Sequence, residues 1–238
     1  WRWIDMMMAR VEPSPSRPVK YILDGTPVER GAAMRAPYSD RPAEQGRMNY
    51  TEDEIRQFVQ IAAQSPHQLL VHIVGDVPLG RLFSAMRSVG GDWTQKRVRI
   101  EHGEFISSYF DEAKALGVVL VQNPAHFMNP EVVHARYGPD RTRTISAFRS
   151  AMERGLPVAI GSDGPLNPWL NVMFAAMHPV NPNERVTRER AVLAYTAGSA
   201  YAEMKEEEKG TIAAGKLADL ALLSQDIFSV PVEELPNT

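Results

Sequence analysis

The chain has 238 residues, of which 44% are hydrophobic, so it can bury the core of one large domain or of a large domain with a small one. Its formal net charge of −3 offers no basic surface for a nucleic acid or an anionic membrane. It contains no apolar run of the roughly 18 residues that span a membrane, and it has no cysteine, which excludes disulfides and thiolate metal sites.

Neither end of the sequence has the features that are typical of a natural chain terminus. The sequence opens on Trp1 rather than on methionine, shows no signal-peptide layout, and stops at Thr238 without a closing element. We therefore expect a portion of a longer protein, with the cytoplasm as its expected location.

Strand-like and helix-like segments alternate along the chain. Predicted strands are apolar runs at 19–25, 68–76, 96–104, 118–124 and 156–165. Predicted helices cover 51–65, 79–89, 107–117, 140–155 and 186–203. The clearest start is at Thr51, where Glu54 completes a capping box.

This alternation is typical of a parallel sheet whose strands are connected by crossover helices. Five strand-helix units indicate an α/β fold that forms most of a TIM (β/α)₈ barrel. After Glu203 the composition of the sequence changes. A charged linker is followed by a turn bounded by glycines and by a predicted strand rich in leucine. We predict barrel structure over 1–205 and, over 206–238, a linker with strands of a small β domain.

Polar side chains lie within or directly after each predicted strand. Lys20 lies in the first, His72 in the second, His102 ends the third, Gln122 and Asn123 end the fourth, and Asp163 ends the fifth. In a parallel barrel the carboxyl ends of the strands meet on one rim, and the active sites of such barrels lie at this rim. Imidazoles from adjacent strands can share one ion, and His with Asp suits Zn²⁺ or another divalent first-row metal.

Taken singly, each of these residues has a simpler interpretation. A lone histidine in a strand is more often a hydrogen-bonded core residue, Lys20 could be a surface lysine with a buried stem, and Asp163 could cap the following turn. Their shared position at the polar ends of one strand series favours a common site. Trp169, just beyond Asp163, and His178, in a later loop, are placed to reach a substrate.

Several short motifs occur along the chain in an order that resembles a known protein family. VKYILDGT, VHIVGD, RIEHGE, VQNPAHF, AIGSDGP and KGTIAAGKLADLALLSQDIF occur in this order. The sequence resembles the amidohydrolase superfamily, in amidohydrolase family 3, the branch that includes N-substituted formamide deformylases. The resemblance runs from Val19 nearly to the end of the chain, and implies about strands 4 to 8 of the barrel with part of a small β-sandwich domain.

The resemblance also implies roles for particular residues. Lys20 resembles the fourth-strand lysine that CO₂ carboxylates so that it bridges two metals. His72 and His102 resemble the fifth- and sixth-strand metal ligands. Asp163 resembles the eighth-strand aspartate, a metal ligand and general base.

Two features depart from the family pattern. The His-x-His motif of the first strand is absent, because no two of the six histidines are spaced that way. Strands one to three lie outside the sequence, which leaves two sheet edges open. We therefore expect a homo-oligomer or a missing N-terminal portion to cover them.

The leading functional hypothesis is a metal-dependent hydrolase that cleaves a C–N bond of a small amide-type substrate. Asp163 would act as general base and then acid, and Lys20, His72, His102 and Asp163 would hold one or two ions, most simply Zn²⁺. Gln122 and His126 are expected outside the ligand set, in contact with substrate or with the ligands. The alternative is a non-catalytic folded fragment or a binding protein on the same scaffold.

Overall fold

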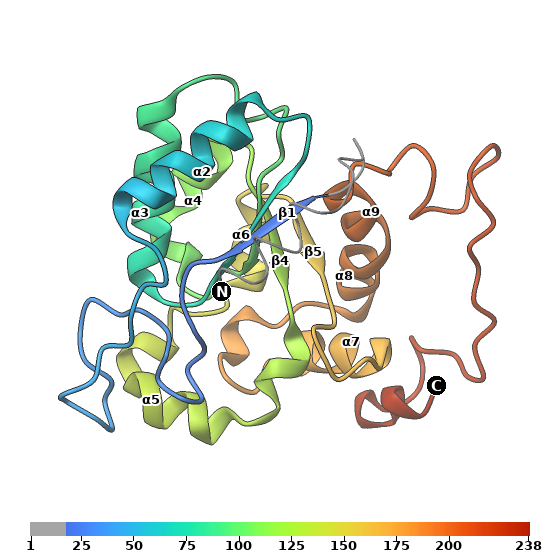
Figure 1. Cartoon of the computed structure of the whole chain (residues 1–238). Helices are drawn as coiled ribbons and strands as arrows, with labels where there is room; N and C mark the ends of the chain where they lie inside the picture. The colour runs from blue at the N-terminus through green and yellow to red at the C-terminus, as the bar shows by residue number, and fades with distance from the viewer. Residues whose placement is uncertain (1–17) are drawn as a thin grey trace.

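Five strands form one fully parallel sheet in a computed structural model that describes residues 18–238 (Figure 1). The strands are β1 (Val19–Ile22), β2 (Leu69–Ile73), β3 (Arg99–His102), β4 (Val119–Gln122) and β5 (Val158–Ile160). Their order across the sheet equals their order along the chain. The predicted strands and the partial (β/α)₈ barrel are confirmed, while residues 1–17 of the predicted barrel portion lie outside the described residues.

Helices connect the strands and flank the sheet (Figure 1). The α-helices are α2 (Glu52–Gln64), α3 (Asp76–Val89), α4 (Phe110–Ala115), α5 (Pro130–Thr142), α6 (Phe148–Glu153), α7 (Pro168–Met177), α8 (Arg188–Leu193) and α9 (Ser199–Ala202). Shorter turns are η1 (Ile106–Tyr109), η2 (Pro124–Met128), η3 (Pro182–Glu184) and η5 (Val232–Asn237), with a π-helical turn η4 (Ala194–Gly198). The capping box before α2 is confirmed, since Thr51 Oγ1 accepts from the Glu54 N–H and Glu54 Oε2 accepts from the Thr51 N–H.

The two faces of the sheet are buried in different ways. Side chains alternate along each strand, and Ile73 and Ile100 belong to the main core together with Phe58 of α2 and Phe83 of α3. On the opposite face, Val119, Val121 and Ala159 form a small separate cluster with Ala202 of α9. One face is therefore covered by the crossover helices, and the β4–β5 part of the other by α9.

The turn η4 lies close against the edge strand β5. A Cβ at Gly198 would lie 2.5 Å from the Val158 carbonyl oxygen, so only glycine allows this approach. The Ser199 hydroxyl then donates to the Ile160 carbonyl at 2.8 Å. These contacts satisfy part of an edge that would otherwise have no partner.

The single helix predicted over 140–155 is wrong. Helix α5 ends at Thr142 and α6 begins at Phe148, and between them Ser146 takes a left-handed backbone with φ 49°. The Ser146 N–H donates to the Glu104 carbonyl at 2.8 Å, and its own carbonyl contacts His178 Nε2 at 2.9 Å. These long-range hydrogen bonds hold the chain in a conformation that a continuous helix excludes.

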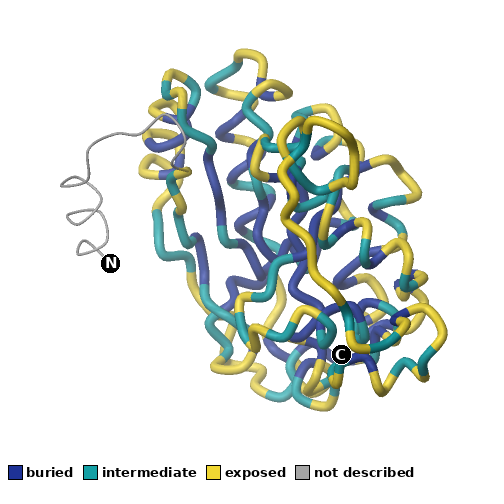
Figure 2. The backbone as a smooth tube through the Cα atoms, turned by 90° about the vertical axis from the view of Figure 1, so that its right-hand side faces the viewer, coloured by how far each residue is buried: buried dark blue, intermediate teal, exposed yellow. Residues whose placement is uncertain are grey.

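The C-terminal segment 206–238 has no strand, contrary to the sequence prediction, and its one regular element is η5. Leu220 and Leu222 of the expected strand are 68% and 102% exposed, and Figure 2 shows much of the segment as exposed chain. A strand requires a neighbouring strand to accept and donate its hydrogen bonds, and no described strand pairs with this segment. The domain boundary near residue 205 stays a prediction.

Within residues 18–238, no helix combines the length and the apolar character needed to cross a membrane.

Candidate metal centre

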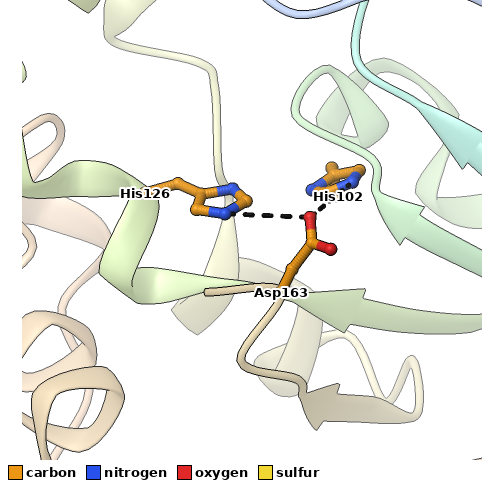
Figure 3. A group of neighbouring side chains, drawn as sticks. All are labelled: His102, His126 and Asp163. Carbon is orange, nitrogen blue, oxygen red and sulfur yellow. Dashed lines mark ion pairs between the residues drawn. The ribbon is translucent and has the colours of Figure 1, made fainter. Parts of the chain in front are cut away.

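Three donor side chains meet at the carboxyl end of the sheet. His102 is the last residue of β3, His126 lies in η2 directly after β4, and Asp163 follows β5. The Nε2 atoms of His102 and His126 lie 3.7 and 3.8 Å from the same oxygen, Oδ2 of Asp163 (Figure 3). The two imidazole rings are stacked, with centroids 5.5 Å apart.

These separations suit a shared metal ion. One ligand atom from each of the three residues lies within 4.8 Å of the other two. Zn–N and Zn–O bonds of about 2.0–2.2 Å place two ligands of one tetrahedral ion roughly 3.4 Å apart. The two distances to Asp163 Oδ2, 3.7 and 3.8 Å, are slightly longer than this, so the three side chains would close around one ion by adjusting their side-chain angles.

A fourth side chain, His72, adjoins this group. Its ring meets that of His102 edge to face, with centroids 4.5 Å apart, because β2 and β3 are neighbours. The Nε2 atoms of both rings are buried without a hydrogen-bond partner. Buried polar atoms are normally paired, so two orphaned imidazole nitrogens at one rim fit residues that bind a metal.

Both rings are also held in the form that binds metals. Burial lowers the pKa of His72, and the positive charge of Lys20 lowers it further. Burial holds the pKa of His102 well below its usual value, with smaller contributions from His72 and His126. Neutral imidazole is the metal-binding form of histidine.

The backbone redirects two of the site residues. His102 and Asp163 have positive φ angles of 70° and 48°, which are uncommon for residues other than glycine. Gln122, fully buried, donates from its side-chain amide to the His102 carbonyl and so supports this conformation. Such local strain is typical of functional sites.

Lys20 shares a sheet face with His72 but lies further from the rim. On β1 it pairs with Leu70, while Ile22 pairs with His72, so Lys20 lies two residues nearer the amino end of the strands. Its side chain is exposed on this sheet face. The structure thus places Lys20 on the same sheet face as His72, and its role as a ligand stays a prediction.

Two further candidates lie outside the cavity at the rim. His178 is fully buried, its Nε2 contacts the Ser146 carbonyl at 2.9 Å, and its Nδ1 accepts from the Asn181 N–H at 3.1 Å. Trp169 packs against the main core. Neither side chain lines the cavity described below, and their contact with substrate stays a prediction.

Sequence reasoning did not single out Asp24, which organises the loops behind the site. Its fully buried carboxylate accepts hydrogen bonds from the backbone N–H groups of Ala33, Val74 and Gly75 at 2.7–3.0 Å. Burial raises its pKa to about 7, although these three hydrogen bonds lower it. The sequence signal that could have identified Asp24 is its position in LDGT, directly after the apolar run of the first strand.

The rim opens into a cavity of about 370 Å³, a size typical of small-molecule sites. His72, His102, His126 and Asp163 form one part of its lining. The remaining wall is largely apolar and includes Val74, Phe127, Met128, Val132, Val133 and Val180. A small, mostly apolar molecule can therefore reach the candidate ligands.

Comparisons with known proteins agree with this arrangement. The chain is 26% identical over 231 residues to YtcJ of Bacillus subtilis strain 168, covering 91% of this chain and 44% of that protein. It is 26% identical over 199 residues to the N-substituted formamide deformylase of Arthrobacter pascens, covering 78% of this chain and 37% of that protein. The chain thus spans less than half the length of these curated relatives.

A solved structure has the same fold. The crystal structure of an uncharacterized metal-dependent hydrolase from Pyrococcus furiosus matches with a TM-score of 0.79 and 26% identity, covering 88% of this chain and 44% of that one. The family model described as "Amidohydrolase family" matches residues 11–238. This chain belongs to the amidohydrolase family.

Proposed function

We propose that this chain forms the greater part of the active site of a metal-dependent hydrolase that cleaves the C–N bond of a small amide. His102, His126 and Asp163 hold a divalent cation, with Zn²⁺ as the first candidate, and His72 adjoins them as a further ligand. The observation that carries the proposal is the convergence of three donor atoms, from the ends of three consecutive strands, within 4.8 Å of one another.

The donor set matches the chemistry of such a site. Imidazole nitrogens and a carboxylate oxygen, with no thiolate, are ligands of catalytic zinc sites. A bound divalent cation supplies a Lewis acid that polarises a carbonyl oxygen and lowers the pKa of water. Membership of the amidohydrolase family and the fold shared with a metal-dependent hydrolase support this class of reaction.

Asp163 is the residue best placed to move protons. Its side chain is 51% exposed where it lines the cavity, and one of its oxygens lies beside two imidazoles. In this proposal Asp163 accepts a proton from the water that attacks the amide carbonyl. It then donates that proton to the nitrogen as the C–N bond breaks, which releases an amine and a carboxylic acid.

Carboxylation of Lys20 is a separate part of the proposal. A carbamate on this side chain would add a negatively charged oxygen ligand on the face that carries His72. It would remove the ammonium charge that now lowers the pKa of His72 and His102. The carbamate would complete a ligand set for one ion with His72 and His102, or bridge two ions.

The second candidate function is a non-catalytic binding protein on the same scaffold. The largely apolar wall of the cavity supports it, since such a wall can hold a small molecule without turning it over. The cavity and the orphaned imidazole nitrogens favour the hydrolase.

The test is hydrolysis of N-benzylformamide by the chain loaded with Zn²⁺ and by the same chain after chelation. We expect release of benzylamine only with metal, and a loss of at least about 100-fold in Asp163→Asn, as for removal of a general base. Asp111→Asn is the matched control, because the Asp111 side chain is 99% exposed outside the cavity. Metal binding without turnover would favour the binding protein.

A further inference from the structure

The cavity contains a second polar region that the proposed metal centre does not use. Glu104 and Ser146 line the same cavity as His102 and Asp163. Glu104 lies on the chain just after β3, and Ser146 lies between α5 and α6. The two residues come from separate connections, so their presence on one wall is a product of the fold.

Their polar atoms are left without partners. Ser146 Oγ and Glu104 Oε2 are buried without a hydrogen bond of ordinary geometry. The hydroxyl of Tyr137 lies beside the Glu104 carboxyl and can hydrogen-bond one part of it, which leaves further acceptor positions of the carboxyl open. Native proteins pair nearly all such groups, and an exception calls for an explanation. A ligand that completes the hydrogen bonding is the explanation favoured by atoms in a cavity wall.

The backbone fixes this region in place. The Ser146 N–H donates to the Glu104 carbonyl at 2.8 Å, which joins the two residues directly. The Ser146 carbonyl contacts His178 Nε2 at 2.9 Å, and the His178 ring stacks on Phe127 with centroids 4.4 Å apart. This network holds Ser146 in its left-handed conformation. The buried His178 therefore supports the wall of the cavity, although its own side chain does not line it.

The rest of the wall defines what a ligand must look like. The side chains of Val74, Val133 and Val180 line the cavity together with the two polar regions. A ligand that satisfies all three parts is apolar in its body and polar at two points.

We propose that Glu104 and Ser146 bind the hydrogen-bond-donating end of the substrate, a hydroxyl, amine or amide N–H group carried on an apolar body. The position of the scissile bond at His102 and Asp163 rests on the proposed function; recognition of the donor group does not. Such a site rejects analogues that lack the donor, because its acceptors then stay buried and unpaired.

The test compares two probes, 3-phenylpropan-1-ol and its methyl ether, which differ in a single hydrogen-bond donor. Binding to the metal-free chain is measured by calorimetry or ligand-observed NMR in the presence of a chelator. We expect the wild type to bind the alcohol about tenfold more tightly than the ether, the size of one hydrogen bond to a carboxylate.

Glu104→Met replaces the carboxyl by an apolar group of similar size. We expect it to abolish the preference for the alcohol while the ether binds at least as tightly as before. Glu131→Met is the matched control, since Glu131 is exposed at the start of α5, and it should keep the preference. If Glu104→Met does not fold, Ser146→Ala serves instead and should reduce the preference.

Equal binding of both probes to the wild type would overturn the proposal, as would a preference that persists in Glu104→Met. Because the experiment contains no metal, it separates this inference from the proposed function. A chain that binds no metal but prefers the alcohol would support the recognition site and contradict the metal centre.

Discussion

The rings of His72 and His102 meet edge to face with centroids 4.5 Å apart, one from each of two adjacent strands. Parallel pairing brings them together, because Glu101 pairs with His72 and His102 follows it at the end of β3. The positive φ of His102 then determines where its ring lies. Two imidazoles with buried, unpaired Nε2 atoms form a site that is complete only when something else binds.

The first prediction concerns His102→Ala. We expect this variant to lose at least about 100-fold in affinity for Zn²⁺, because loss of a ligand should exceed the 10–100-fold effect of changing a residue that supports one. The free energy of unfolding of the metal-free protein should change far less, since the unpaired His102 Nε2 contributes no hydrogen bond to the fold. Metal titration and urea denaturation measure the two quantities.

His67→Ala is the control for this prediction, since His67 lies just before β2 at the opposite end of the sheet. It should bind Zn²⁺ as the wild type does. Full metal affinity in His102→Ala would show that His102 is not a ligand.

The second prediction is a pH dependence that follows from the lowered pKa of His102. Below about pH 6.5 the unfolded chain takes up a proton at this histidine and the folded chain does not, so the free energy of unfolding falls as the pH drops. In His102→Leu this contribution is absent. Between pH 7 and 5 the metal-free variant should therefore lose up to about 2 kcal/mol less stability than the wild type.

Chemical denaturation at several pH values measures this difference. Parallel curves for the wild type and His102→Leu would mean that the folded protein accepts the proton readily and that burial does not hold the ring neutral.

How far the sequence predicts this structure depends on whether the signal is local. Thr51 and Glu54 set a helix start that the structure confirms, and the five apolar runs give all five strands in order. The break at Ser146 was missed because contacts from Glu104 and His178, 42 and 32 residues away in sequence, impose it. The helix propensities of neighbouring residues do not depend on contacts with residues that are distant in sequence.

The same distinction applies to the site. Strand ends pointed to His72, His102 and Asp163, and the structure brings His102 and Asp163 together and places His72 beside them. His126 was expected outside the ligand set, yet it lies as near to Asp163 as His102 does. The short helix η2, which begins at Pro124, turns His126 back over the rim, and the sequence alone does not reveal that direction.

The third prediction concerns Asp24→Ala. This change leaves the N–H groups of Ala33, Val74 and Gly75 buried without their acceptor. Each unsatisfied group costs about 1–3 kcal/mol, so the total loss of stability should exceed about 3 kcal/mol. Asp24→Asn keeps one acceptor oxygen and should lose less.

Equilibrium urea denaturation at pH 7 measures both variants. A loss below about 1 kcal/mol in Asp24→Ala would show that water or a rearranged loop replaces the carboxylate.

The fourth prediction is self-association. In the described structure β1 pairs only with β2, and Leu220 and Leu222 are exposed on an extended segment. Open strand edges and apolar side chains are surfaces that pair with other chains. Sedimentation should give a species larger than the 26.5 kDa of one chain.

Leu222→Asp adds a charge to this segment and should shift the distribution toward the monomer. A wild-type chain that sediments as a stable, folded monomer of 26.5 kDa would contradict this prediction.

The central claim is that His102, His126 and Asp163 bind one divalent ion together, and calorimetric titration of the metal-free chain with Zn²⁺ tests it most directly. We predict a saturable site in the wild type and a loss of at least about 100-fold in affinity in each of His126→Ala and Asp163→Asn. Failure of the wild type to bind Zn²⁺, or equal affinity in all three proteins, would contradict the account.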